Sequence, residues 1–145
     1  MMASGRLEGK VALVTGAASN PGLGRATALR LAEEGASLMV TDLDLVGVQN
    51  CAQAIEAAGG KAQSMRQDVV NPEDWQAVME ATEAAFGGVD IVVNNAGIAI
   101  LKPIMELTLE EWNRQIEVNL SSVFLGCQAA IGAMQKRGGG SIINL

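Results

Sequence analysis

The residue types that carry proton chemistry in most enzymes are nearly absent from this sequence. Its 145 residues contain no His and no Tyr, which removes the commonest general base and the commonest phenolic acid. Cys51 and Cys127 lie far apart, and no His stands beside them to complete a set of zinc ligands. We interpret both as buried free thiols, and we predict no metal site.

Binding chemistry is better represented, by a glycine-rich loop between a short apolar run and a stretch of helical periodicity. Glycines in such a turn let the backbone approach a pyrophosphate, whose charge then lies on the free N–H groups of the following helix. The residues expected to hold the phosphates are Gly16, Ser19, Asn20, Gly22, Leu23 and Gly24. Which of Ser19, Asn20 and Pro21 touches a phosphate is left open by the sequence.

An acid, Asp42, ends the second apolar run. In the dinucleotide fingerprint this position hydrogen-bonds the adenosine ribose, and its charge repels a 2′-phosphate. No Lys or Arg stands within the loop or directly after Asp42, so we expect NAD as the cofactor in preference to NADP. The simpler alternatives are a solvated turn acid or a cap for the next helix, which Asp44 could supply equally well.

The apolar pattern predicts elements that bring these two turns together. Short aliphatic runs alternate with longer stretches of helical spacing, which is typical of βαβ units and a parallel sheet. Strands are predicted at residues 11–15, 37–41, 61–67, 89–93 and 141–145. Helices are predicted at residues 23–34, at 45–58, at 72–86 after an Asn71 cap, and from a capping box at 108–111 toward 137.

Five such strands and four helices fit an α/β fold of the Rossmann type, a doubly wound parallel sheet in the order 3-2-1-4-5. We expect one domain over residues 1–145. Ligands bind such a sheet where the strand order reverses, which here lies between the strands at 11–15 and 89–93. The glycine loop follows one of these strands.

Together these features resemble the short-chain dehydrogenase/reductase family. The likeness also includes Asp68-Val69, Asn94-Asn95-Ala96-Gly97 and Val118-Asn119-Leu120, in the order and spacing of that family. The resemblance implies that Asp68 and Val69 flank the adenine. It further implies that the cofactor cleft is lined by Asn95, Ala96 and Gly97.

The resemblance gives Asn119 the catalytic role in this chain, as the residue that perturbs its helix and holds a water in the proton relay. Simpler alternatives exist for each motif. Asp68 could merely end its strand, residues 94–97 could form an ordinary turn, and Asn119 could be a buried amide bonded to backbone.

The glycine loop departs from the family pattern in one respect. Five residues separate Gly16 from Gly22, where the family usually has three. This spacing resembles the related enoyl-thioester reductases. The Asn-Asn-Ala-Gly run is not typical of those enzymes, and it favours ketone and alcohol chemistry.

The chemistry implied by the resemblance is hydride transfer between a nicotinamide and a carbonyl or carbinol carbon, on a 3-ketoacyl or secondary-alcohol substrate. In the family a Ser, a Tyr and a Lys beyond the strand at 141–145 perform the proton transfer. We therefore expect this chain to be the cofactor-binding part of a longer oxidoreductase, incomplete at its C-terminus and inactive alone. The alternative is a complete, non-catalytic nucleotide-binding or interaction module.

Charge and hydropathy limit the other partners. Ten Lys and Arg against sixteen Asp and Glu give a net charge of −6, which disfavours nucleic acid and anionic membranes. The N-terminus has no apolar core of signal-peptide length, and residues 123–134 are too few to span a bilayer. We expect a cytoplasmic protein with a small-molecule substrate, and the resemblance implies a homodimer or homotetramer.

Overall fold

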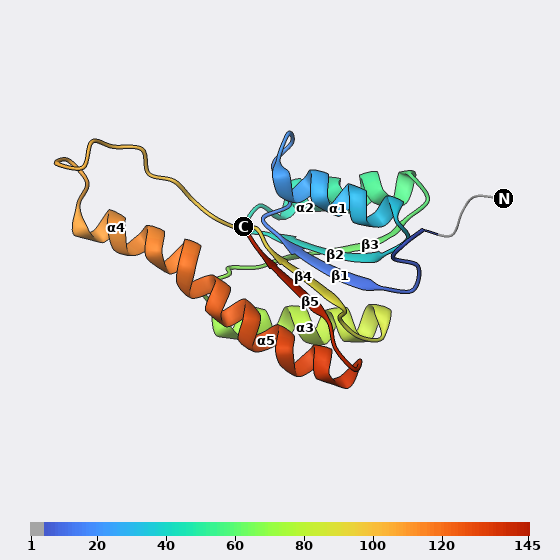
Figure 1. Cartoon of the computed structure of the whole chain (residues 1–145). Coiled ribbons are helices and arrows are strands. Elements are labelled where there is room, and N and C mark those ends of the chain that lie inside the picture. The colour runs from blue at the N-terminus through green and yellow to red at the C-terminus, as the bar shows by residue number, and fades with distance from the viewer. Residues whose placement is uncertain (1–4) are drawn as a thin grey trace.

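In the computed structural model, which describes residues 5–145, the aliphatic runs form one parallel sheet in the order β3-β2-β1-β4-β5 (Figure 1). The strands are β1 (Val11–Thr15), β2 (Ser37–Asp42), β3 (Lys61–Arg66), β4 (Ile91–Asn94) and β5 (Ser141–Asn144). All neighbouring pairs are parallel. The predicted fold class and strand order are therefore confirmed.

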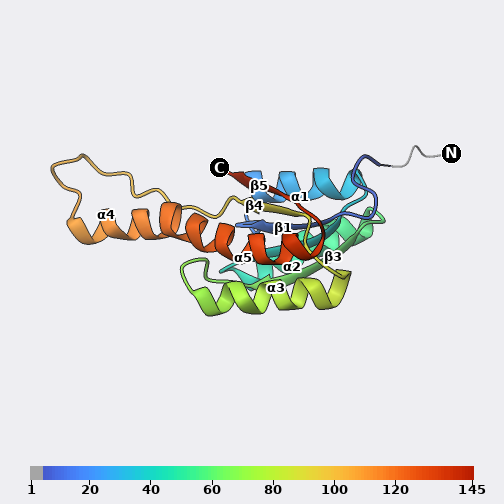
Figure 2. The same cartoon turned by 60° about the horizontal axis from the view of Figure 1, so that its bottom comes forward.

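Helices cover both faces of the sheet, so that the strands are buried between two layers (Figures 1 and 2). Helices α1 (Leu23–Glu33) and α2 (Leu45–Ala57) lie on one face, and α3 (Pro72–Phe86) and α5 (Ser122–Lys136) lie on the other. Successive residues of β1 enter opposite apolar clusters, with Val14 on the α1 and α2 side and Leu13 on the other. A strand buried on both faces has no polar face, which explains its continuous apolar run.

Strand β4 begins later than predicted, at Ile91, although the Asp90 backbone already bonds to both neighbouring strands. Its N–H donates to the Val11 carbonyl at 2.9 Å, and its carbonyl accepts from the Ser141 N–H at 2.9 Å. The Asp90 carboxylate accepts a hydrogen bond from the Val11 N–H at 2.8 Å, and Arg137 donates to it at 3.0 Å. Burial raises the pKa of Asp90, but the hydrogen bonds from Arg137 and Val11 outweigh that effect and leave the pKa below its usual value.

The long helix predicted from the capping box is interrupted. Helix α4 (Leu109–Ile116) starts at Thr108, whose side chain and that of Glu111 form the expected reciprocal cap. A π-helical turn (Glu117–Ser121) follows α4 directly, and α5 begins at the next residue. Asn119 lies in the middle of this wider turn.

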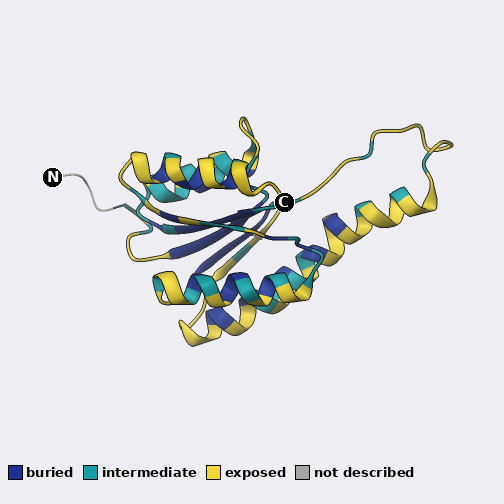
Figure 3. Cartoon of the chain, turned by 180° about the vertical axis from the view of Figure 1, so that it is seen from behind, coloured by how far each residue is buried: buried dark blue, intermediate teal, exposed yellow. Residues whose placement is uncertain are grey.

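Helix α4 and the loop before it project from the sheet and are largely exposed (Figures 1 and 3). Leu101 and Met105 in that loop are each 92% exposed. Taken together, α4, the π-helical turn and α5 (Leu109–Lys136) are long and apolar enough to cross a membrane by length and composition alone, unlike the shorter stretch considered from the sequence. A core helix of a water-soluble protein can meet the same criterion. In this structure α5 packs on α3, β4 and β5.

The two cysteines differ from each other. Cys51 is buried as predicted, and burial raises the pKa of its thiol. Cys127 is only partly buried, so that half of the prediction is wrong. Its Sγ faces the Asn94 side-chain amide at 4.0 Å across the space between α5 and β4.

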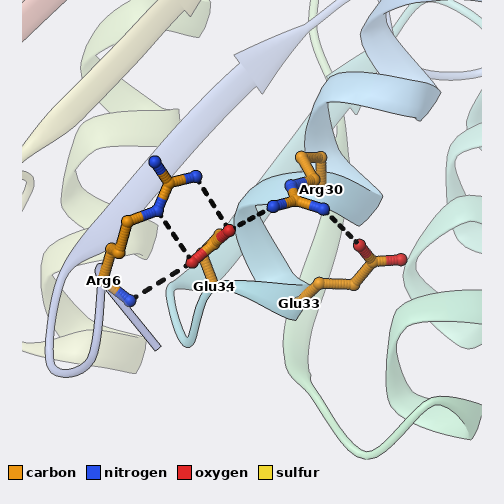
Figure 4. A network of polar contacts seen from close by, with 4 residues as sticks. All are labelled: Arg6, Arg30, Glu33 and Glu34. Atoms are coloured by element: carbon orange, nitrogen blue, oxygen red, sulfur yellow. Dashed lines mark hydrogen bonds and ion pairs between the residues drawn. The ribbon is translucent and has the colours of Figure 1, made fainter. Parts of the chain in front are cut away.

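The segment that precedes β1 is tied to the end of α1 by a small ionic network (Figure 4). The Arg6 guanidinium donates two hydrogen bonds to the Glu34 carboxylate, at 2.8 and 3.1 Å, and Arg30 also pairs with it. Hydrogen bonding from Arg6 is the main cause that lowers the pKa of Glu34 to about 2.

This network predicts an acid-dependent contribution to stability. The pKa of Glu34 is lower in the folded protein, at about 2, than its usual value of 4.5, so the contribution is complete above pH 4.5 and is lost as the pH falls through 2. The Glu34→Gln variant should therefore be less stable than the parent at neutral pH, with a difference that narrows on acidification. Chemical unfolding over this pH range measures the difference. Glu33→Gln is the control, and an unchanged difference for Glu34→Gln in acid would contradict the assignment.

Candidate functional site

A cavity of about 390 Å³ opens at the carboxyl ends of the central strands, where doubly wound sheets bind their ligands. It collects most of the residues predicted from the sequence. Those that line it are Gly16, Ser19, Gly22, Leu23, Gly24, Asp42, Asp68, Val69, Asn95, Ala96 and Gly97. A second cavity, of about 370 Å³, lies between α3 and α5, away from the glycine loop and the residues predicted from the sequence.

Asn20 is the predicted phosphate residue that the structure does not bring to the cavity. Asn20 and Pro21 are exposed at the tip of the glycine loop, and neither lines the cavity wall. The chain folds back on itself at this tip. A Cβ on Gly22 would lie only 2.6 Å from the Ser19 carbonyl oxygen, so the close approach leaves no room for a side chain. Ser19 is therefore the one of the three open candidates that faces the cavity.

The first and third glycines of the loop are required by close packing. Gly16 has a φ of +67°, and a Cβ on it would lie 2.8 Å from the Ala96 Cα. A Cβ on Gly24 would lie 2.3 Å from the Gly16 carbonyl oxygen and 2.5 Å from Asn95 Nδ2. The start of α1 therefore packs directly against the ends of β1 and β4.

Helix α1 begins at this cavity without a side-chain cap, since its N-cap residue is Gly22. The other described helices that begin from a loop are all capped, by Asp44, Asn71 and Thr108. The first-turn N–H groups of a helix have no partner within the helix. At α1 they are available, with the positive end of the helix dipole, to an anion in the cavity.

Asp42 is held in place by two backbone donors. Its Oδ2 accepts from the Ala18 N–H at 3.0 Å and its Oδ1 from the Asp44 N–H at 3.1 Å. The cap of α2 is Asp44, whose carboxylate accepts from the Gly47 N–H at 3.0 Å. The alternative that Asp42 caps this helix is therefore wrong, and its carboxylate lies on the cavity wall in a fixed orientation.

Asp68 and Val69 leave β3 in a turn that is also fixed. The Asp68 N–H donates to the Asp74 carboxylate at 2.7 Å, and the Asp68 carboxylate accepts from the Val70 N–H at 3.2 Å. The Trp75 indole N–H donates to the Val69 carbonyl at 2.8 Å. Asp68 thus lies in the turn toward α3, two residues after β3 ends at Arg66, and it also faces the cavity.

Asn95 connects the two central strand ends, together with Thr15, a residue that the sequence analysis missed. The Asn95 side-chain amide donates to the carbonyls of Thr15 and Gly16 at 2.9 and 3.0 Å. In return the Thr15 hydroxyl accepts from the backbone N–H groups of Asn95 and Ala96 at 3.1 and 3.0 Å. We call this reciprocal set of bonds the Thr15–Asn95 clamp. Its sequence signal is one hydroxyl at the end of an otherwise aliphatic buried strand.

Asn119 does not line the cavity, but its amide holds a residue that does. Its Oδ1 accepts from the Ile98 N–H and its Nδ2 donates to the Ile98 carbonyl, both at 2.8 Å. Asn119 is exposed, so the expectation of a buried amide is wrong, while the expectation that it bonds to backbone is confirmed.

Further cavity residues were not predicted from the sequence: Leu43, Gln67, Ile98, Arg114 and Val118. Arg114 is the one cationic side chain on the described cavity wall, and it pairs with Glu117 at 3.0 Å. It comes from α4, one turn before the buried Val118. No local pattern marks Arg114, because it reaches the cavity only through the path of the preceding loop.

Comparison with known proteins places this geometry in a family. Residues 10–145 match the family model described as short chain dehydrogenase. A 2,5-dichloro-2,5-cyclohexadiene-1,4-diol dehydrogenase of Sphingobium indicum is 44% identical over 140 residues, which are 97% of this chain and 55% of that protein. A D-threitol dehydrogenase of Mycolicibacterium smegmatis is 43% identical over 97% of this chain and 53% of its own length.

A cyclohexanol dehydrogenase of an Acinetobacter strain is 40% identical over 97% of this chain and 56% of its own length. Among solved structures, a short-chain dehydrogenase/reductase from Burkholderia xenovorans superposes with a TM-score of 0.91 at 40% identity. That match covers 97% of this chain and 57% of the other. The chain spans about half the length of the curated relatives it matches.

The packing of Gly24 gives a test of the site geometry. Gly24→Ala should lower the free energy of unfolding by about 1–3 kcal/mol, since its Cβ would meet the Gly16 backbone and Asn95. Urea unfolding measures this loss. Gly132→Ala in α5 is the matched control, because nothing lies within 4 Å of its added Cβ and a helical alanine is favoured. Equal stability of the two variants would contradict the close approach at Gly24.

Proposed function

Because this chain belongs to the short-chain dehydrogenase family, we propose that it binds a nicotinamide dinucleotide in the cavity at the ends of β1 and β4 and acts in alcohol–ketone oxidoreduction. The observation that carries the proposal is the meeting of three features on one cavity wall. These are the glycine loop with the uncapped start of α1, the fixed Asp42 carboxylate and the Thr15–Asn95 clamp.

The glycine loop fits a pyrophosphate. Ser19, Gly22 and Gly24 face the cavity, and the side-chain-free approach to the start of α1 lets an anion reach backbone N–H groups. The described cavity wall contains no Lys at this loop, so the phosphates would depend on these N–H groups, on the helix dipole and on the Ser19 hydroxyl.

Asp42 favours a ribose with free hydroxyls. Each of its carboxylate oxygens already accepts one backbone hydrogen bond and keeps a further lone pair for a hydroxyl donor. A 2′-phosphate in the same place would meet a fixed negative charge. We therefore assign NAD as the preferred cofactor and NADP as the weaker one.

The rest of the cavity accommodates the two ends of the cofactor. Asp68, Val69 and Val118 would flank the adenine, and the Arg114 guanidinium lies on the same wall. Gly97 and Ile98, beyond the Thr15–Asn95 clamp, would border the nicotinamide, which supplies hydride acceptance and donation when bound. The role assigned to Asn119 is to hold the Ile98 carbonyl, and with it a water of the proton relay.

The substrate class that we propose is a secondary alcohol or the matching ketone. Relatives of this chain are named for a cyclohexadienediol, for cyclohexanol and for threitol, all of which carry secondary hydroxyls. Apolar side chains beyond the cavity, such as Leu101 and Met105, favour an apolar substrate body. The enoyl-thioester reductases are less well supported, because the Thr15–Asn95 clamp uses the Asn-Asn-Ala-Gly run that those enzymes do not typically have.

Proton transfer in this proposal needs residues outside these 145. The chain has neither Tyr nor His, and the family uses a Ser, a Tyr and a Lys for this step. We therefore propose that this chain supplies the cofactor-binding part of the active site. A non-catalytic nucleotide-binding module is the second candidate, and it shares the same binding cavity.

The cofactor preference has a direct test at Asp42. NADH should bind more tightly than NADPH, and Asp42→Ala should narrow the gap by roughly tenfold or more, since hydrogen bonds to a charged group contribute about 1.5–3 kcal/mol. Fluorescence titration with both cofactors measures the ratio. Asp44→Ala, which removes only the cap of α2, should leave the ratio unchanged. Equal affinities of the unaltered protein for the two cofactors would refute the Asp42 assignment.

The missing proton donor predicts a separation of binding from turnover. The 145-residue chain should bind NADH and yet oxidise or reduce no secondary alcohol or ketone, including cyclohexanol and cyclohexanone. Loss or gain of NADH absorbance with these substrates measures turnover, and titration of NADH measures binding. Turnover by the 145-residue chain would show that its own residues transfer the proton.

A further inference from the structure

Three side chains spaced four residues apart hold the segment that leaves the cavity after β4. Asn119 bonds both backbone groups of Ile98 at 2.8 Å, and Gln115 Oε1 accepts from the Ile100 N–H at 3.0 Å. One turn before Gln115 in α4, Glu111 pairs with the Lys102 ammonium group. We call these contacts the α4 ladder.

The spacing of the α4 ladder has a simple geometric cause. Four residues of an α-helix, such as those from Glu111 to Gln115, advance about 6 Å, and two residues of extended chain span about 6–7 Å. An extended segment that runs beside a helix therefore meets every fourth helical residue with every second residue of its own. The N–H groups of alternate residues in such a segment also point the same way, so Gln115 and Asn119 reach Ile100 and Ile98 from one side.

The α4 ladder determines the position of one cavity wall from behind. Gly97 and Ile98 line the cavity, whereas Glu111, Gln115 and Asn119 do not. Gly97 itself lies against Asn119, since a Cβ there would be 3.2 Å from Asn119 Oδ1. The Thr15–Asn95 clamp fixes the start of this segment and the α4 ladder fixes its continuation.

Little else holds this segment. Leu101 is 92% exposed, and the following residues Ile104 and Met105 are 76% and 92% exposed. Among the described residues, the hydrogen bonds that join residues 98–102 to the rest of the chain are those of the α4 ladder. Beyond Ile98 the segment is held beside α4 by the Gln115 contact and by the Lys102–Glu111 pair, and the Gln115 contact is the one that reaches its backbone.

We propose that Gln115 is a positioning residue, which holds the cavity wall at Gly97 and Ile98 for the nicotinamide half of the cofactor. This inference rests on the proposed function. Asp42, Asp68 and Val69, on the β2 and β3 side of the cavity, are independent of the α4 ladder. Loss of the Gln115 contact therefore affects one end of the cofactor and leaves the adenosine end in place.

The test compares two ligands on two variants. Gln115→Met keeps the length of the side chain and removes the acceptor, whereas Gln115→Glu keeps an oxygen for the Ile100 N–H. Gln115→Met should weaken NADH binding about three- to tenfold and leave binding of ADP-ribose, which lacks the nicotinamide, unchanged. Gln115→Glu should bind both ligands as the parent does. Calorimetric titration of the purified parent and of both variants measures the affinity of each protein for each ligand.

Two controls separate a positioning role from general destabilisation. Asn113→Met, on the exposed side of α4, should change neither affinity. Amide hydrogen exchange should be faster at Ile98 and Ile100 in Gln115→Met, and unchanged in β1.

The outcomes distinguish this inference from the proposed function. If the parent protein binds neither NADH nor ADP-ribose, the proposed function fails and the inference with it. If the parent binds both ligands and Gln115→Met weakens both equally, or neither, the proposed function stands and the positioning role of Gln115 is wrong.

Discussion

The site depends on how the carboxyl ends of β1 and β4 are joined. After these two strands the chain departs to opposite faces of the sheet, toward α1 on one side and α4 and α5 on the other. The Thr15–Asn95 clamp crosses this divergence with hydrogen bonds of 2.9–3.1 Å in both directions. Because these groups are partly buried, the loss of one bond would leave a polar group without a partner. Such a group lowers the free energy of unfolding by about 1–3 kcal/mol. The clamp also requires a glycine at position 24, since Asn95 occupies the space that a larger side chain there would need.

The clamp is one part of a polar border along the carboxyl edge of the sheet. Thr41 donates its hydroxyl hydrogen to the Gln67 side chain at 2.7 Å, and Asn94 donates to Asn144 at 2.9 Å. These residues lie at or next to the carboxyl ends of β2, β3, β4 and β5. Buried polar side chains are usually hydrogen-bonded, and here side chains of neighbouring strands bond to one another. Among the described residues, Gln67 Nε2 and Asn94 Oδ1 nevertheless have no hydrogen-bond partner. Of this polar border, Gln67 and Asn95 line the cavity.

Much of the fold could be predicted from local signals, whereas the site could be predicted only in part. The bounds of β1 and the cap of α3 at Asn71 follow from apolar periodicity and capping chemistry, and the structure agrees with both. The late start of β4 was missed, because Val89 is as fully buried as a strand residue although it precedes the strand. Arg114 and Gln115 were missed for a different reason. Their contacts depend on the path of an exposed loop, which no periodicity describes.

The absence of a side-chain cap on α1 links the occupancy of the cavity to the stability of the fold. Asp44, Asn71 and Thr108 complete their helices from within the chain, but the first turn of α1 is completed only by water or by a bound anion. A ligand that binds there takes the part of a missing capping residue. Because such a ligand binds only the folded protein, it raises the free energy of unfolding. This increase grows with the logarithm of the ligand concentration once that concentration exceeds the dissociation constant. A higher concentration of the proposed cofactor would therefore stabilise the folded protein against unfolding.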